Sequence, residues 1–193
     1  MASIPGATAY PAIPPLDKIG NHRGLSVHAA APLKGFTPEK ERVILLKTLT
    51  TVASVALPIE ERWSIKRCRY APDGESVGRV CIATGTHGDE MMGQLIVYLV
   101  QQRITAHPDA LRGTVDFYPM LNPLGLDIGE RMVPSGTRLD MNRAFPGSPD
   151  GTPLEYMCHQ VIQDMRGADL VLDLHASARN KSELYEVRVS AKE

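Results

Sequence analysis

Apolar residues occur along this chain in short runs typical of buried strands and in two longer stretches with helical spacing. Three short runs, each bounded by glycine, proline or charged residues, cover residues 79–83, 114–121 and 169–174. The last of these has the composition of a central strand. At 63–70, apolar and polar side chains alternate, which predicts a strand with one buried face. Residues 43–57 are also rich in apolar side chains and fit either a helix or a strand.

Two segments carry apolar residues at the spacing of a helix. The first runs from about Asp89 to Arg103. The second begins with clear helix-start signals, because Thr152 can act as an N-cap, proline occupies the next position and Glu155 completes a capping box. Gly167 is placed to end it. The order strand, helix, strand, long loop, helix, strand predicts an α/β fold with a mixed, mostly parallel sheet flanked by helices.

Two other segments show no sustained period. Residues 1–38 contain six prolines among several alanines, so we expect an irregular arm there and a folded domain over residues 39–193. Residues 122–151 contain five glycines and four prolines and are expected to form a long loop. A compact domain rarely keeps so long an irregular segment without a functional reason.

Composition narrows the class of protein without indicating a function. The chain has 193 residues and a formal net charge of −1, which suits one medium domain and gives no electrostatic attraction for nucleic acid or anionic lipid. The longest apolar run, residues 95–100, is far too short for a membrane span, and the first thirty residues lack a secretory-signal pattern. Three cysteines without a CxxC pair indicate reduced thiols. We therefore expect a cytoplasmic protein with neither nucleic acid nor membrane as partner.

Two of the histidines directly follow predicted strands. His87 comes after strand 79–83, and His175 ends strand 169–174. If these strands are parallel neighbours, both imidazoles emerge at the same edge of the sheet, and Glu90 lies three residues beyond the first of them. Two imidazoles and a carboxylate form the open ligand set of a catalytic zinc. Alternatively, His87 merely ends a strand and Glu90 merely favours the start of a helix.

The long loop adds candidate charges for substrate binding. It contains Arg131, Arg138 and the run 140–147. Guanidinium groups near a zinc site suit a substrate carboxylate or a developing oxyanion. Alternatively, these arginines are solvated loop charges.

Five short motifs follow one another in an order that resembles a known family. They are Gly85-Thr-His-Gly-Asp-Glu90, Asn122-Pro-Leu-Gly125, Gly129-Glu-Arg131, Asp140-Met-Asn-Arg143-Ala-Phe-Pro-Gly147 and Asp173-Leu-His175-Ala-Ser177. Together they resemble the zinc-carboxypeptidase superfamily and, within it, the succinylglutamate desuccinylase/aspartoacylase-like branch. The similarity runs from about Val80 to the end of the chain and matches the N-terminal part of the catalytic domain.

The resemblance implies one zinc ion per chain, bound by His87, Glu90 and His175. It implies that Asn142 and Arg143 hold the carboxylate of the substrate. The implied reaction is hydrolysis of an amide bond in a small N-acyl amino acid, with a zinc-activated water as nucleophile.

Two further residues receive roles from the same resemblance. Arg131 matches the arginine that polarises the scissile carbonyl, with Arg138 as the alternative if the loop aligns differently. Asp140 matches the aspartate that orients the first ligand histidine, which fixes the ring tautomer.

The sequence departs from the family pattern near its C-terminus. Family members carry a glutamate general base on a strand well downstream of the last zinc ligand, and we expect that base beyond Glu193. Glu183 and Glu186 lie on one more strand candidate, residues 182–190, and are expected to be exposed rather than catalytic. We therefore expect a fold that is incomplete at the C-terminus. Two alternatives to the deacylase remain open, a zinc carboxypeptidase acting on peptides and a zinc-binding module without catalysis.

Overall fold

The computed structural model describes residues 44–57, 60–134 and 139–177. All of them belong to one compact unit, Lys40–Glu193. The arm predicted for residues 1–38 and the strand candidate at 182–190 lie outside the described residues. Within the described part of the chain, no helix is both long and apolar enough to cross a membrane.

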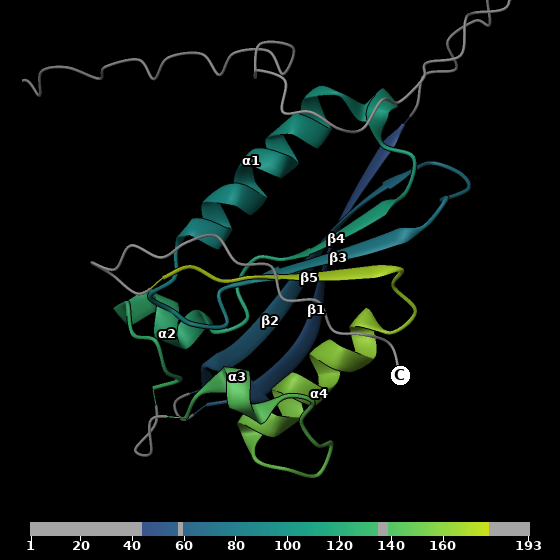
Figure 1. The fold of residues 1–193 in the computed structure, drawn as a ribbon. Helices are drawn as coiled ribbons and strands as arrows, with labels where there is room; N and C mark the ends of the chain where they lie inside the picture. The colour runs from purple at the N-terminus through teal and green to yellow at the C-terminus, as the bar shows by residue number, and fades with distance from the viewer. Residues whose placement is uncertain (1–43, 58–59, 135–138, 178–193) are drawn as a thin grey trace, which may run out of the picture. The chain divides into compact units, whose positions relative to one another are not determined.

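The described residues form one mixed sheet with helices packed on it (Figure 1). The elements are β1 (Leu45–Ala56), β2 (Arg62–Pro72), β3 (Arg79–Thr84), α1 (Met92–Ala106), the short 3-10 helix η3 (Pro108–Ala110), β4 (Thr114–Tyr118), α2 (Pro123–Ile128), α3 (Met141–Ala144), α4 (Pro153–Met165) and β5 (Leu170–Leu174). The strand order is β1-β2-β4-β3-β5. β2 is antiparallel to β1 and β4, whereas β3 is parallel to β4 and β5. The predicted α/β class is confirmed.

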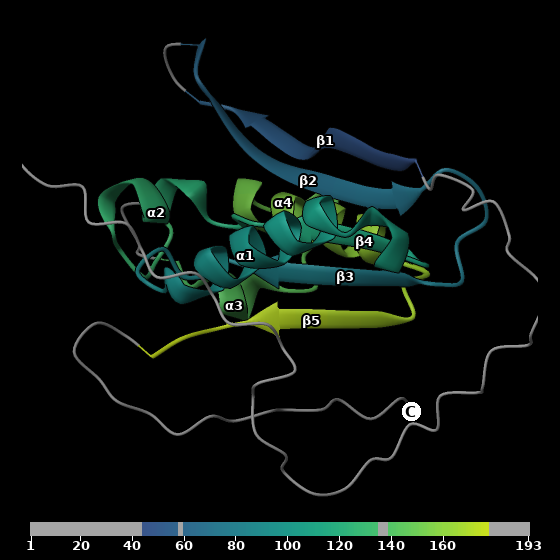
Figure 2. The same cartoon turned by 90° about the horizontal axis from the view of Figure 1, so that it is seen from above.

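Helices α1 and α4 cover opposite faces of this sheet (Figures 1 and 2). The side chains of β2 point alternately to the two faces of the sheet and contribute to the core on each. Trp63 and Ile65 join the core beneath α4, and Tyr70 joins the core beneath α1. α4 forms as its sequence signals predict. The Thr152 capping box is present, the apolar stripe is buried, and Gly167 follows the helix with a φ of 77°.

Arginines from β2 and β3 tie the C-terminal half of α4 to the sheet through two aspartates. Asp116 of β4 is completely buried and accepts hydrogen bonds from Arg69 Nε (2.7 Å) and Nη2 (2.8 Å) and from Arg79 Nε (2.7 Å). Arg79 Nη2 also donates to the carbonyl oxygen of Asp164 (2.6 Å), and Arg67 Nη1 donates to the Asp164 carboxylate (2.6 Å). Buried charges are tolerated when they are paired and hydrogen-bonded in this way.

Two local expectations differ from the structure, and one alternative that the sequence left open is resolved. The segment 43–57, left open as helix or strand, contributes β1, and α1 begins at Met92 rather than at Asp89 because residues 85–91 form a turn. The segment 122–151 is not wholly irregular, since it contains α2 and α3. The N-terminus of α2 is capped by Asn122, whose side chain accepts from the Gly125 amide.

β5 also differs from its predicted central position, because it forms an edge of the sheet within the described residues (Figure 2). Its side chains Leu170, Val171 and Leu172 are 39–49% exposed. On the neighbouring helix α1, a stripe of apolar residues is exposed as well, including Leu95 and Leu99. The apolar composition predicted that this segment forms a strand. It did not predict that these side chains are exposed among the described residues.

Candidate metal centre

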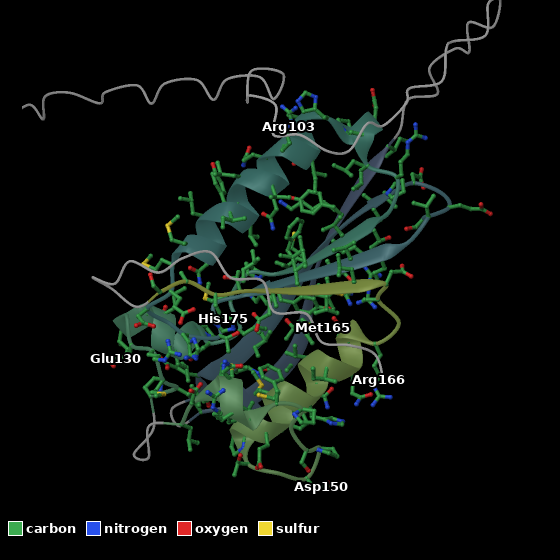
Figure 3. All side chains as sticks on the ribbon, in the orientation of Figure 1. Arg103, Glu130, Asp150, Met165, Arg166 and His175 are labelled. Carbon is green, nitrogen blue, oxygen red and sulfur yellow. The ribbon has the colours of Figure 1, made fainter. Side chains whose placement is uncertain are left out.

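The two strand-following histidines meet at one edge of the sheet. β3 and β5 are parallel and hydrogen-bonded, with Thr84 opposite Leu174 at their C-terminal ends. His87 lies in the turn after β3, and His175 follows β5 directly (Figure 3). The ring centroids are 5.0 Å apart. The parallel arrangement expected from the sequence is therefore confirmed, and it brings both imidazoles to one place.

Glu90 lies between the two imidazoles and contacts both. His87 Nδ1 is 2.7 Å from Glu90 Oε1, and His175 Nδ1 is 3.0 Å from Glu90 Oε2. The backbone amide of Ala176 donates to Oε2 as well, at 2.9 Å. One ligand atom from each of these three side chains lies within 4.8 Å of the others. Two imidazole nitrogens and a carboxylate oxygen form a donor set that suits zinc and leaves a coordination position free.

The outer nitrogen of each ring faces a second carboxylate. His87 Nε2 is 3.2 Å from Asp140 Oδ1, and His175 Nε2 is 2.9 Å from Asp173 Oδ2. A carboxylate only accepts hydrogen bonds, so the outer carboxylate keeps a proton on Nε2, and the proton of Nδ1 that faces Glu90 is the one a metal would displace. Both rings thus present Nδ1 toward the same point. The family resemblance implied a role for Asp140 but none for Asp173.

The electrostatics of the cluster favour an ionised carboxylate at its centre. Burial by itself raises the pKa of Glu90, but the hydrogen bonds from His175, from His87 and from the Ala176 amide outweigh it and hold this pKa well below its usual value. The hydrogen bonds to Asp173 and then to Glu90 raise the pKa of His175 to about 10. Glu90 is therefore available as an anionic ligand, whereas His175 has to lose a proton before it can bind a metal.

The turn that carries His87 is packed tightly against the segment around α2. A Cβ atom on Gly88 would lie 2.1 Å from the Gly125 carbonyl carbon and 2.4 Å from the Glu130 carbonyl oxygen. Only glycine fits where two backbones approach so closely. The backbone on each side of Gly88 is thereby held in place, which fixes where His87 and Glu90 emerge.

Arg131 also reaches the cluster from the segment after α2. Its Nη1 lies 2.6 Å from Glu90 Oε1, and its side chain is 41% exposed. Among the arginines expected near the site, Arg131 is thus in contact with a ligand side chain. Arg138, the alternative, lies outside the described residues, as do Glu183 and Glu186.

The expected substrate-binding residues lie on α3, next to the cluster. Asp140 is the N-cap of this short helix, and its Oδ1 accepts from the Asn142 amide at 2.9 Å while it also faces His87. Asp140 thereby links the start of α3 to the first histidine. The side chains of Asn142 and Arg143 are exposed. Both could contact a substrate that approaches the cluster from solvent.

Comparison with known proteins supports the family resemblance. Residues 76–193 match the family described as succinylglutamate desuccinylase/aspartoacylase catalytic domain. A relative named N-alpha-acetyl-L-2,4-diaminobutyric acid deacetylase, from Halomonas elongata, is 35% identical over 98 residues, which cover 49% of this chain and 27% of that protein.

Solved structures of this group share the fold. A succinylglutamate desuccinylase/aspartoacylase from Rhodobacter sphaeroides superposes with a TM-score of 0.58 at 24% identity, covering 74% of this chain and 43% of that one. An aspartoacylase family protein from Mesorhizobium loti gives a TM-score of 0.51 at 27% identity, covering 69% and 40%. The chain therefore spans less than half the length of these relatives. Because the family match covers more than half of this chain, the chain belongs to the succinylglutamate desuccinylase/aspartoacylase catalytic-domain family.

Proposed function

We propose that this chain provides the metal centre of a zinc-dependent hydrolase that cleaves the amide bond of a small N-acyl amino acid. The convergence of His87, Glu90 and His175 on one point carries the proposal. The deacetylase name of the Halomonas elongata relative supports deacylation as the reaction. Both histidines turn Nδ1 inward, which suits a metal that replaces the hydrogen bonds they now make to Glu90.

Each neighbouring residue then has a distinct task. A zinc ion at such a site acts as a Lewis acid and makes water a stronger nucleophile at neutral pH. His87, Glu90 and His175 would hold this ion, and Asp140 would keep the His87 ring turned toward it. Arg131 is close enough to the ligands to stabilise negative charge that develops on the carbonyl oxygen of the substrate.

Substrate recognition is assigned to the exposed side chains of α3. Arg143 carries a planar guanidinium that can form two parallel hydrogen bonds to a carboxylate, and Asn142 can add another. Both are exposed on the helix whose N-cap, Asp140, faces His87, which fits a role in holding a small substrate with a free carboxylate. Arg143 would bind the ground state and the transition state alike, whereas Arg131 would act mainly on the transition state.

Metal content is the first test of this proposal. We expect one zinc per chain in the purified protein, by elemental analysis, and loss of that zinc in His87→Ala and in His175→Ala. His107→Ala is a matched control, because His107 is exposed just after α1. Zinc content that stays unchanged in His175→Ala would overturn the ligand assignment.

Activity is the second test. In a protein that combines this chain with a carboxylate general base, we expect turnover of N-acetyl-2,4-diaminobutyrate or another N-acyl amino acid, with kcat lowered about 10²–10³-fold in Arg131→Ala. Arg143→Ala should instead raise KM. Arg103→Ala is a suitable control, since Arg103 lies on α1 far from His175 (Figure 3). Release of the C-terminal residue of a peptide, without turnover of any N-acyl amino acid, would contradict the deacylase assignment.

A further inference from the structure

The second histidine of the cluster is held differently from the first. His87 is buried, so packing against the neighbouring turn restricts its ring. The side chain of His175 is 33% exposed and follows β5, which is an edge strand among the described residues, so packing within that part of the chain restricts its ring less. A ligand with so little packing needs a specific hydrogen bond to keep one orientation.

Asp173 supplies such a hydrogen bond. Residues two apart on an extended strand point to the same side, which places the Asp173 carboxylate beside the His175 ring. The distance from Asp173 Oδ2 to His175 Nε2 is 2.9 Å, compared with 3.2 Å for the corresponding pair of Asp140 and His87. The carboxylate can only accept, so it keeps a proton on Nε2 when a metal displaces the proton by which Nδ1 bonds to Glu90.

We propose that Asp173 is a positioning residue that holds His175 in the orientation and tautomer required to bind the metal. This inference rests on the proposed zinc site. Asp169, just before β5, has a structural role instead. Its Oδ2 accepts from the backbone amide of Arg79 at 2.7 Å, which joins the start of β5 to β3. Asp173 instead directs its carboxylate to an imidazole, so its loss should affect the metal more than the fold.

Zinc affinity of the full chain, measured by competition with a chromogenic chelator, tests the inference. We expect Asp173→Ala to weaken zinc binding about 10–100-fold, the cost typical of losing a partner to a ligand histidine. Asp173→Asn should recover part of this loss because its amide oxygen still accepts from Nε2–H. Asp150→Ala, which removes an exposed carboxylate remote from His175, should bind zinc as the wild type does (Figure 3).

Two further readouts separate positioning from a structural role. The zinc-free Asp173→Ala chain should keep the circular-dichroism spectrum and cooperative unfolding of the wild type, with only the small loss of stability typical of a partly exposed ion pair. In the cobalt-substituted chain, the exchangeable ring N–H signal of His175 in the proton NMR spectrum should be visible in the wild type and in Asp173→Asn. It should be lost to rapid solvent exchange in Asp173→Ala.

The possible outcomes distinguish the two proposals. Zinc affinity unchanged in Asp173→Ala, with stoichiometric zinc in the wild type, would overturn the role of Asp173 while leaving the metal centre intact. A weaker affinity accompanied by loss of the native circular-dichroism spectrum of the zinc-free chain would overturn it in favour of a structural role. A wild-type chain that binds no zinc would overturn the metal centre and this inference with it.

Discussion

Replacing Asp116 by asparagine should destabilise the protein by about 3 kcal/mol, since the removal of one partner of a buried ion pair typically costs about 3–5 kcal/mol. The carboxylate is fully buried on β4 and receives three hydrogen bonds of 2.7–2.8 Å from Arg69 and Arg79. Asparagine keeps the shape of the side chain but removes the negative charge that pairs with the two guanidinium groups. Both arginine side chains are partly exposed, at 33% and 20%, and can recover some hydration. This places the cost at the lower end of the range.

Urea unfolding at pH 7 measures this cost directly. With a urea m-value of about 2 kcal/mol/M, a loss of about 3 kcal/mol lowers the unfolding midpoint by about 1.5 M. Asp150→Asn serves as the control, because it removes the charge of an exposed aspartate and should leave the midpoint almost unchanged. A loss below about 1 kcal/mol in Asp116→Asn would refute the reasoning that this carboxylate neutralises its arginines in a buried setting.

The same variant should alter the pH dependence of stability. Burial raises the pKa of Asp116, but hydrogen bonds from Arg69 and Arg79 outweigh burial and lower it overall. A carboxylate with a depressed pKa in the folded state stabilises that state fully above its unfolded pKa of about 3.9. This stabilisation disappears as the pH falls through the folded pKa. The difference between the wild type and Asp116→Asn should therefore narrow below about pH 4, and a constant difference would contradict this origin.

Two other predictions concern single positions, and a third concerns the three cysteines. Thr152→Ala removes half of the capping box of α4 and should cost about 1 kcal/mol in urea unfolding, whereas no loss would mean that the cap contributes nothing. Gly88→Ala places a Cβ against the Gly125 and Glu130 backbone, so it should lower stability by about 1–3 kcal/mol and weaken zinc binding measured by chelator competition. Burial raises the pKa of all three thiols, that of Cys158 to about 12, so iodoacetamide at pH 8 should label them only after unfolding. Labelling of the folded chain, detected by mass spectrometry, would show that a thiol is accessible.

The sequence predicted those parts of the fold that depend on local signals. The capping residues and apolar stripe of α4 are encoded within one segment, and the structure reproduces them. α2 also carries local signals, because Asn122 precedes a proline and Gly129 ends the helix with a φ of 65°. It was nevertheless expected to be irregular, since six residues are too few to show a hydrophobic period.

Features that depend on distant residues could not be predicted in the same way. The pairing of Asp116 with Arg79 joins neighbouring strands that are far apart in the sequence, and nothing in either segment indicates the partner. The proximity of His87 and His175 could be predicted because each histidine follows a recognisable strand. The contact between Asp173 and His175 had a signal in the sequence, because the two polar residues occupy alternate positions of one extended segment. The ring nitrogen of His175 that faces Asp173 could not be predicted, because it depends on the position of Glu90.

The edge position of β5 has a consequence for how a bound metal would be lost. Strands at the border of a sheet open locally at lower free energy than strands paired on both sides. β3, which precedes His87 and Glu90, is paired on both sides, whereas β5 is paired on one side within the described residues. Fraying of β5 would therefore detach His175 first, while the other two ligands still held the ion. The lifetime of the complex would then depend on how often this five-residue strand opens, as well as on the strength of the bonds to His87 and Glu90.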